Sequence, residues 1–483
     1  MIISFSCEGH RKTKLPLGAN ETFESELLLL QDYFSIPGIA AIVEQNGKIV
    51  YENYHGYANI EKKIKVDSTT VFPIASLTKI YATVLILQQV EEGKLSLEEP
   101  INKFLDNTTL SDSIKIKHIL SHTSQGSIGD EFFYSARFGL LTQVLEKTSG
   151  KSLEQLVQEN ILAPLKLEHT LLLNDSAQLA NKSISFAQPY LLDNGIEKGF
   201  VDFGYSAAAG LAANARELMQ FNIALDENKL IEESTKNEMC SPFKKGLPYG
   251  YGIFTQEVEG IDIIWGYGQY DCYSSLLMKI PAQNISMVLL ANNNLMSDPA
   301  RLIMGNITTS LFAISFLKNY VLEKTDIPIL ENSDTLASIK TKNVFLDRDK
   351  LLAQALAESF MARFSPDRFK TSEQLLNEVF NRYPDFLNYA DINLLHTLCF
   401  LKDVAFYMEL GPFNTFDKEI EQIGGHLLKS SPNNPYLHSY LGLFYNRKGE
   451  MDKARYHFEH IVNAQNFSNN WYTVEAKNWL GQH

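Results

Sequence analysis

The chain carries the sequence FPIASLTKIYATVLIL at residues 72–87. Ser76 stands three residues before Lys79, so on a helical turn the hydroxyl and the amine lie on the same face. Extended chain precedes Ser76, and helix-forming residues follow from Lys79 onward. A serine at the start of a helix also lies beside unpaired backbone N–H groups, where the helix dipole favours negative charge. This stretch therefore predicts a nucleophile, Ser76, with its base, Lys79, and half of an oxyanion hole.

The same Ser-x-x-Lys spacing occurs at two other places in the chain, where the context differs. Ser241 precedes Pro242, and a following proline disfavours helical geometry at the serine. Ser315 and Lys318 lie in an apolar segment that is typical of a core-facing helix. Because Ser76 stands where extended chain meets a helix, we expect it to be the functional serine.

Composition limits the class of protein. The 483 residues suffice for two or three domains, and 45% hydrophobic with 21% charged residues is usual for a globular protein. A net charge of -14 argues against a nucleic-acid partner and against an anionic membrane surface. No apolar run approaches the roughly 20 residues that span a bilayer, so no transmembrane segment is expected. The four cysteines lack metal-ligand spacing.

The first 20 residues differ in character from the rest. Residues 1–7 are apolar and end at Cys7, after which the chain becomes polar. This start resembles the end of a lipoprotein signal with Cys7 as the lipidated residue, which would place the protein in the cell envelope or periplasm. The alternative is a short leader on a cytoplasmic protein.

Predicted strands lie at both ends of a helical middle. Asn46-Gly47 joins two short strands as a hairpin turn. The predicted strands cover 39–44, 48–54, 249–254, 261–265, 274–280 and 286–291, and the predicted helices cover 23–33, 79–92, 98–105, 114–121, 137–149, 151–163 and 300–320. This order predicts an α+β domain over residues 21–322, whose antiparallel sheet is completed by the late strands.

The C-terminal part has a different pattern. A polar linker is predicted at 323–346, and an all-α domain follows at 347–483. Residues 441–458 carry Leu-Gly-x-x-Tyr, then Gly, Ala and Phe at spacings that resemble a tetratricopeptide repeat. Such a helical-repeat domain could bind a protein partner, or it could only pack against the first domain, and the pattern leaves both open.

Four further segments resemble the successive motifs of one protein family, and they occur in the same order. They are EGKLSLEEPI at 92–101, IKHILSHTSQG at 116–126, FYSARFGLL at 133–141 and AAGLAANAREL at 208–218. Together with residues 72–79 they resemble the serine β-lactamase-related family, which includes class C β-lactamases, D-Ala-D-Ala carboxypeptidases, D-aminopeptidases and esterases. The resemblance implies a β-lactamase/transpeptidase-like fold, in which an antiparallel sheet is flanked by helices and a helical subdomain.

The resemblance also assigns roles to residues. Tyr134 matches the family's active-site tyrosine, which would relay a proton between the serine and the leaving group. An ammonium beside such a phenol can lower its pKa. His122 is expected to support the loop rather than to titrate in catalysis.

Two departures from the family pattern bear on substrate choice. Ala136 stands where the family has an asparagine that contacts the substrate amide, and alanine has no polar side chain. The third motif, Lys-Thr-Gly or His-x-Gly, is matched by Gly266-Tyr267-Gly268, with Gly266 in the cationic position. A shift of one residue would put Tyr267 there instead. In the first register, the oxyanion hole comes from the N–H groups of Ser76 and Gln269.

Aromatic residues near this motif are candidates for the pocket wall. Trp265, Tyr267 and Tyr270 could form it, although strand alternation predicts that at least one is core.

We therefore predict a serine hydrolase in which Ser76 forms an acyl-enzyme, Lys79 is the neutral base and Tyr134 assists the leaving group. This chemistry needs no metal or cofactor. The missing asparagine and cation favour a small ester or amide as substrate. The alternatives are a penicillin-binding or D-peptidase activity on cell-wall peptides, and a catalytically silent scaffold that binds a ligand and a partner.

Overall fold

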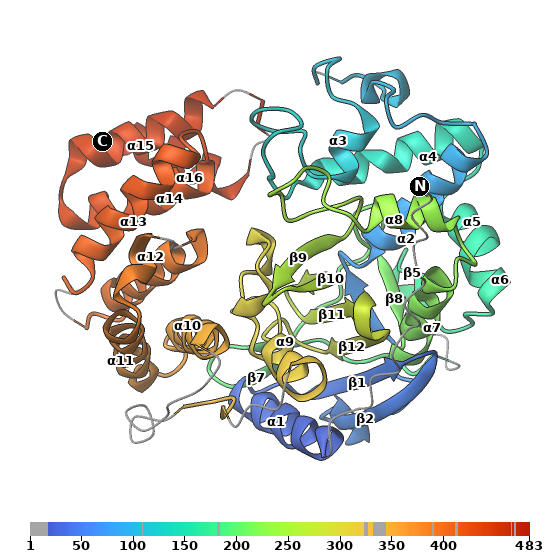
Figure 1. Ribbon diagram of the computed structural model, residues 1–483, viewed down its shortest axis with the longest axis horizontal. Helices are drawn as coiled ribbons and strands as arrows, with labels where there is room; N and C mark the ends of the chain where they lie inside the picture. Colours follow the sequence, from blue (N-terminus) through green and yellow to red (C-terminus); the bar gives the residue numbers. More distant parts are fainter. Residues whose placement is uncertain are drawn as a thin grey trace, which may run out of the picture.

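A computed structural model describes residues 18–483 except 109, 181–183, 323–326, 332–343, 389–390, 411–413, 465 and 468–469. A sheet lies at the centre with helices on both faces, and the C-terminal helices form a lobe along one side (Figure 1). The predicted fold class, an α+β domain followed by an all-helical region, is confirmed. The segment with Cys7 and most of the predicted linker lie outside the described residues.

The central sheet has seven strands. In spatial order they are β3 (Ile64–Lys65), β2 (Lys48–Asn59), β1 (Gly38–Gln45), β12 (Ile285–Ala291), β11 (Tyr273–Ile280), β10 (Ile261–Tyr270) and β9 (Phe254–Val258). Asn46 and Gly47 both have positive φ, which explains the tight turn predicted between β1 and β2. Because β1 pairs antiparallel with β12, the early hairpin and the late meander form one sheet, as predicted.

Helices cover both faces of this sheet, so β1 is buried along its whole length. Ile42 packs into a core that includes α2 (Thr78–Glu91), whereas Val43 packs into a second core with α1 (Ala19–Tyr33) and α9 (Leu311–Phe316). Alternate residues of one strand therefore serve two separate cores. Helix α2, which follows Ser76, is thereby held against the sheet.

The middle of the chain forms a helical subdomain with small strands. Its elements are β4 (Phe72–Ala75), α3 (Ile116–Leu120), α4 (Leu141–Ser149), α5 (Leu153–Val157), α6 (Ala163–Leu165), β5 (Leu171–Leu172), β6 (Tyr190–Leu192), β7 (Ile196–Lys198), β8 (Leu211–Ala213), α7 (Ala215–Asp226) and α8 (Glu233–Met239). Strands β4, β8 and β5 make a second sheet beside the start of α2.

Three predicted elements were wrong in extent. Apart from an isolated bridge between Tyr249 and Phe254, residues 249–253 form bends rather than a strand, because Gly252 has φ 70° and lies against the Thr83 side chain. Residues 98–105 contain a 3₁₀ turn at Ile101–Phe104 instead of a full helix, since Pro100 is extended. The predicted helix at 300–320 is broken by Gly305, whose φ is 82°.

The Ser315–Lys318 pair has a structural role. The Ser315 hydroxyl donates to the Glu26 carboxylate at 2.7 Å, and the Lys318 ammonium forms a buried ion pair with the same carboxylate. The Asn319 amide also donates to Glu26, at 2.8 Å. This Ser-x-x-Lys pair therefore ties α9 to α1 in the core, away from any cavity described below.

We expect Glu26→Ala to lower the free energy of unfolding by about 3–5 kcal/mol, because Lys318 would be left as a buried charge without its partner. Urea unfolding at pH 7 measures the change. Glu21→Ala on the exposed face of the same helix is the matched control and should change stability little. Equal stability of both variants would contradict the role of the ion pair.

The C-terminal region consists of helices in its described part. They are α10 (Val344–Met361), α11 (Asp367–Arg382), α12 (Ile392–Tyr407), α13 (Asp417–Ser430), α14 (Pro435–Lys448), α15 (Met451–Asn463) and α16 (Trp471–Gln482). Helix α10 has two buried faces: Ala357 packs into the core with α9, and Ala355 packs into the core of the C-terminal helices. The two cores therefore meet at α10. Across the described residues, no helix is both long and apolar enough to cross a membrane.

Candidate active site

Ser76 lies in a tight turn between β4 and α2. The preceding residue, Ala75, has φ 46°, a left-handed conformation that is strained for a residue with a Cβ. The Thr78 hydroxyl holds this turn, since it donates to the Ala75 carbonyl at 2.6 Å and accepts the Leu211 N–H at 3.0 Å. Sequence analysis did not single out Thr78, although it lies within the quoted stretch, because its partner comes from strand β8, more than 130 residues away.

The structure brings Lys79 to Ser76. Lys79 Nζ lies 2.9 Å from Ser76 Oγ and donates to the Ala208 carbonyl at 3.0 Å. The Lys79 side chain is buried, its described hydrogen bonds go to a hydroxyl and a carbonyl rather than to a carboxylate, and burial lowers its pKa from 10.5 to about 7. At neutral pH a large fraction of Lys79 is therefore the free amine, which can accept a proton.

Tyr134 stands beside this pair. Lys79 Nζ lies 4.8 Å from the centroid of the Tyr134 ring, and Tyr134 lines the same cavity as Ser76. Burial raises the pKa of Tyr134 above its ordinary value of 10.0, and the nearby Ser76 hydroxyl opposes this rise only in part. The expected lowering of this pKa is therefore wrong, because desolvation outweighs the neighbouring amine, and Tyr134 is a neutral hydrogen-bond donor.

His122 supports the loop that carries Tyr134. Its Nδ1 accepts the Ser135 N–H at 3.0 Å, and its ring lies 4.2 Å from the Tyr134 ring. Burial, together with Lys79, holds the pKa of His122 well below its usual value. A neutral histidine in this position fixes the loop, in agreement with the supporting role predicted for it.

A cavity of about 390 Å³ opens at Ser76. Its described walls are formed by Ser76, Tyr134, Asp202, Tyr267, Gln269, Tyr270, Asp271, Asp298, Arg301, Leu302, Ile303, Tyr436 and Trp471. These residues come from seven separate parts of the chain, including the C-terminal helices. Of the predicted aromatic wall, Tyr267 and Tyr270 line the cavity, whereas Trp265 is fully buried in the core.

Strand β10 presents alternate residues to this cavity. Tyr267 and Gln269 line it. A Cβ on Gly266 would lie 2.9 Å from the side chain of Leu77, in the turn that carries Ser76. A Cβ on Gly268 would lie 2.0 Å from the Ile74 carbonyl oxygen. The two glycines let the strand approach the turn closely. Because position 268 must be a glycine here, this geometry favours the register that keeps Gly268 as the glycine of the motif, with Gly266 in the cationic position and Tyr267 on the cavity wall.

The charged groups of the cavity were not found from sequence. Arg301 follows the sheet, with Nη1 3.7 Å from Asp298 Oδ1, and its charge acts on the nearby Tyr440. Asp202 and Asp271 add two further carboxylates, and burial, then Asp271, raises the pKa of Asp202. The described wall of the cavity therefore carries one guanidinium and three carboxylates. Sequence analysis missed these residues because they lie on loops without a shared motif.

Ala136 lies at the edge of the site. It is exposed, starts a 3₁₀ turn at Ala136–Leu140, and is not among the described residues that line the cavity. The position carries no polar side chain toward a substrate amide.

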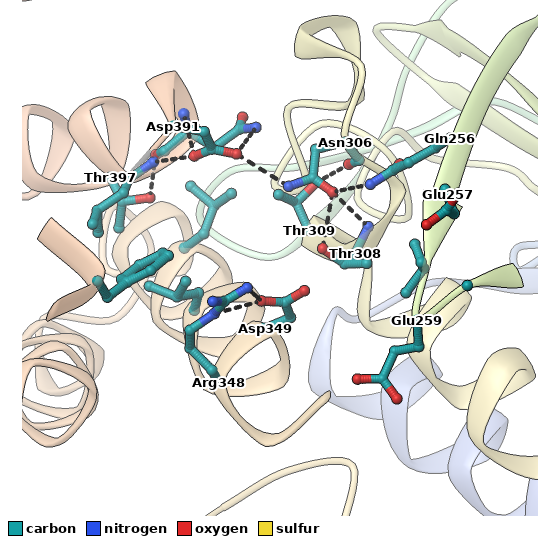
Figure 2. Close-up of a pocket in the computed structure, with 17 residues that line it drawn as sticks. Gln256, Glu257, Glu259, Asn306, Thr308, Thr309, Arg348, Asp349, Asp391 and Thr397 are labelled. Carbon is teal, nitrogen blue, oxygen red and sulfur yellow. Dashed lines mark hydrogen bonds and ion pairs between the residues drawn. The ribbon is translucent and has the colours of Figure 1, made fainter. Parts of the chain in front are cut away.

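A second cavity lies between β9 and the C-terminal helices (Figure 2). Asn306 links its two sides: Asn306 Nδ2 donates to Asp391 at 3.1 Å, and Asn306 Oδ1 accepts from Gln256 at 2.9 Å. On one wall, Arg348 is paired with Asp349. None of its described lining residues is shared with the cavity at Ser76. These contacts tie the helical region to the sheet.

The family model named Beta-lactamase matches residues 29–303, more than half of the chain. The chain belongs to the Beta-lactamase family. The matched range contains Ser76, Lys79 and Tyr134 and ends before the C-terminal helices. The predicted family is confirmed for this range.

Curated relatives match the same part of the chain. Protein flp of Staphylococcus aureus (strain MW2) is 26% identical over 305 residues, which are 54% of this chain and 60% of the relative. D-aminopeptidase of Gluconobacter oxydans (strain 621H) is 20% identical over 308 residues, covering 56% of this chain and 58% of the relative. The chain thus spans about 60% of the length of these relatives.

Solved structures share the fold. A penicillin-binding protein homologue from Pyrococcus abyssi, described as octameric, aligns with a TM-score of 0.54 at 22% identity, covering 56% of this chain and 73% of that one. D-amino acid amidase from Ochrobactrum anthropi SV3 aligns with a TM-score of 0.50 at 17% identity, covering 57% and 92%. Both alignments show the β-lactamase/transpeptidase-like fold predicted from sequence.

Proposed function

We propose that this protein is a serine hydrolase that forms an acyl-enzyme at Ser76 and acts on a small ester or amide. The observation that supports this proposal most directly is the contact of 2.9 Å between Ser76 Oγ and Lys79 Nζ. Burial lowers the pKa of this amine to about 7. A surface lysine would be protonated at neutral pH and could not accept the serine proton. Lys79 is buried beside Ser76, in a position where its free amine can accept the serine proton.

In the first step, Ser76 Oγ attacks the substrate carbonyl carbon and gives its proton to Lys79 Nζ. The carbonyl oxygen becomes an oxyanion, which needs hydrogen-bond donors. We assign these donors to the backbone N–H groups of Ser76 and Gln269, two residues that share the cavity wall. Backbone donors do not depend on the side chain, so they survive the departure from the family's third motif.

In the second step, the tetrahedral intermediate collapses and the bond to the leaving group breaks. Tyr134 gives its hydroxyl proton to the leaving alkoxide or amine and receives a proton from Lys79, so that no net charge is left on the phenol. Water then attacks the acyl ester on Ser76, with Lys79 again as the base. The products are a carboxylic acid and an alcohol or amine.

The charges of the cavity support an uncharged substrate. Three carboxylates, Asp202, Asp271 and Asp298, repel an anion, and the single guanidinium of Arg301 already faces Asp298. A β-lactam carries a carboxylate. This balance therefore favours a neutral ester or amide over a β-lactam or a C-terminal cell-wall peptide.

Two covalent probes test this assignment. We expect a fluorophosphonate to label the protein and a fluorescent penicillin to leave it unlabelled, because the penicillin carboxylate meets the acidic wall. Gel fluorescence after incubation at pH 8 reads both probes. Labelling by both probes supports a penicillin-binding or D-peptidase activity instead, and labelling by neither supports a catalytically silent scaffold.

The tetratricopeptide-like character of the C-terminal helices is part of the same proposal. Helices α14 and α15 form a hairpin in which a Cβ on Gly442 would lie 2.8 Å from the Phe458 ring, and Ala454 is fully buried. Small residues at these positions let paired helices approach closely. The contacts of Asn306 with Asp391 favour packing against the hydrolase domain over the binding of a separate protein partner.

A further inference from the structure

The C-terminal helices contribute two aromatic residues to the cavity at Ser76. Tyr436 lies in the first turn of α14 and Trp471 opens α16. Both residues lie beyond residue 303, where the match to the Beta-lactamase family ends. This wall is therefore a feature of this chain that the family match does not account for.

Trp471 presents an aromatic surface to solvent at this cavity. Trp471 is 53% exposed, whereas Tyr436 is buried. The Tyr472 ring lies 5.2 Å from Tyr436 and 5.5 Å from Trp471, so the three rings form one cluster. Leu302 and Ile303 add apolar surface from the hydrolase domain. An exposed indole in a catalytic cavity offers a face on which a flat apolar group can stack.

The cluster is fixed to the loop that carries Tyr134. The Asn466 carbonyl, five residues before Trp471, accepts from Arg137 at 3.1 Å. The Asn466 side chain donates to the Ser124 carbonyl at 3.3 Å. These bonds hold the start of α16 against the catalytic loop.

Aromatic and electrostatic contacts also hold the C-terminal helices against the part of the chain that forms the cavity. Phe467 packs edge-on against Phe133, the neighbour of Tyr134, with 4.9 Å between the ring centroids. Tyr440 of α14 lies close to Arg301 of the cavity wall, whose charge opposes the rise that burial causes in the pKa of Tyr440. The position of the aromatic pair relative to Ser76 is thus set by several contacts from two helices.

We propose that Trp471 and Tyr436 select the substrate by its acyl group, and that the protein prefers aromatic acyl groups to acetyl. This inference rests on the proposed acyl transfer at Ser76. An acyl group bound to Ser76 projects into the cavity, where Leu302, Ile303 and the two aromatic residues supply the apolar surface. An acetyl group has only a methyl group to place against that surface, whereas an aromatic acyl group has a ring.

The test compares 4-nitrophenyl acetate with 4-nitrophenyl phenylacetate, which share a leaving group and differ only in the acyl part. We expect the wild type to favour phenylacetate in kcat/KM. Trp471→Ala should lower kcat/KM for phenylacetate by roughly fivefold to tenfold and change that for acetate by less than about twofold. Trp471→Phe, which keeps an aromatic face, should retain most of the preference.

The control is Val474→Ala, at a residue of the same helix that is 54% exposed and is not among those lining the cavity. It should leave both substrates unchanged. Equal losses for both esters in Trp471→Ala, or an unchanged ratio, would overturn the inference. Fluorophosphonate labelling of Ser76 distinguishes failure of the acyl-group preference from failure of acyl transfer. If the protein is labelled but Trp471→Ala leaves the ratio of kcat/KM for the two esters unchanged, only the role of the aromatic residues is refuted. If there is neither labelling nor turnover, acyl transfer at Ser76 is refuted as well.

Discussion

Ser76→Ala is expected to abolish ester hydrolysis, with a loss in kcat/KM of about 10⁴-fold or more. The substitution removes the only atom that can form the acyl bond, while the turn remains held by Thr78 and its bonds to Ala75 and Leu211. Hydrolysis of 4-nitrophenyl phenylacetate, followed by the release of 4-nitrophenolate, measures the loss.

Ser241→Ala is the matched control, because Ser241 also precedes a lysine by three residues but is exposed and donates to the Asn237 carbonyl. We expect it to keep full activity. Retention of more than about a tenth of the activity in Ser76→Ala would mean that another group is the nucleophile.

The second large effect concerns Lys79 and pH. Because burial lowers the pKa of Lys79 to about 7, the free amine is lost as the pH falls below that value. We expect kcat/KM to fall about tenfold per pH unit below pH 7 and to level off above pH 8. Burial raises the pKa of Tyr134, so this residue should cause no loss of activity between pH 8 and its ordinary value of 10.0. The profile is measured between pH 5 and 9.5.

Lys79→Met should be inactive over the whole range and yet more stable than the wild type at pH 7. The unfolded chain binds a proton at Lys79 up to its ordinary pKa of 10.5, whereas the folded protein releases it near 7. Wild-type stability therefore rises with pH between these values, and methionine removes the cost of burying the amine. We expect a gain of roughly 2–4 kcal/mol at pH 7, after the loss of the bonds to Ser76 and Ala208.

Urea unfolding at pH 7 and at pH 9.5 measures this difference, which should shrink at the higher pH. An inactive Lys79→Met that is less stable than the wild type would contradict the buried, uncharged base. A wild-type activity that is flat from pH 5 to pH 9 would contradict it as well.

Local patterns predicted much of the fold. Asn46-Gly47 located the first hairpin, and the apolar run after Lys79 located α2, because each depends on residues close in sequence. The extents of other elements depended on tertiary contacts. Gly252 turns the chain where it meets Thr83, and Gly305 interrupts an apolar segment that otherwise has the pattern of one helix.

The residues of the site that belong to sequence motifs were predictable. Ser76, Lys79 and Tyr134 lie together in the structure, as their motifs suggested. The aromatic residues Tyr267 and Tyr270 of the cavity wall were predicted, whereas Arg301 and Trp471 were not, because they come from segments that no motif connects with Ser76. The raised pKa of Tyr134 was missed for a related reason, since desolvation by distant segments is invisible in a local sequence.

The most direct test of acyl transfer is to trap the intermediate. Enzyme mixed with 4-nitrophenyl phenylacetate is quenched in acid within milliseconds to seconds, digested, and mapped by mass spectrometry. A phenylacetyl group on the peptide that contains Ser76, absent from Ser76→Ala, is the predicted result. Turnover without any acylated peptide, or an acyl group on another residue, would contradict the proposed mechanism.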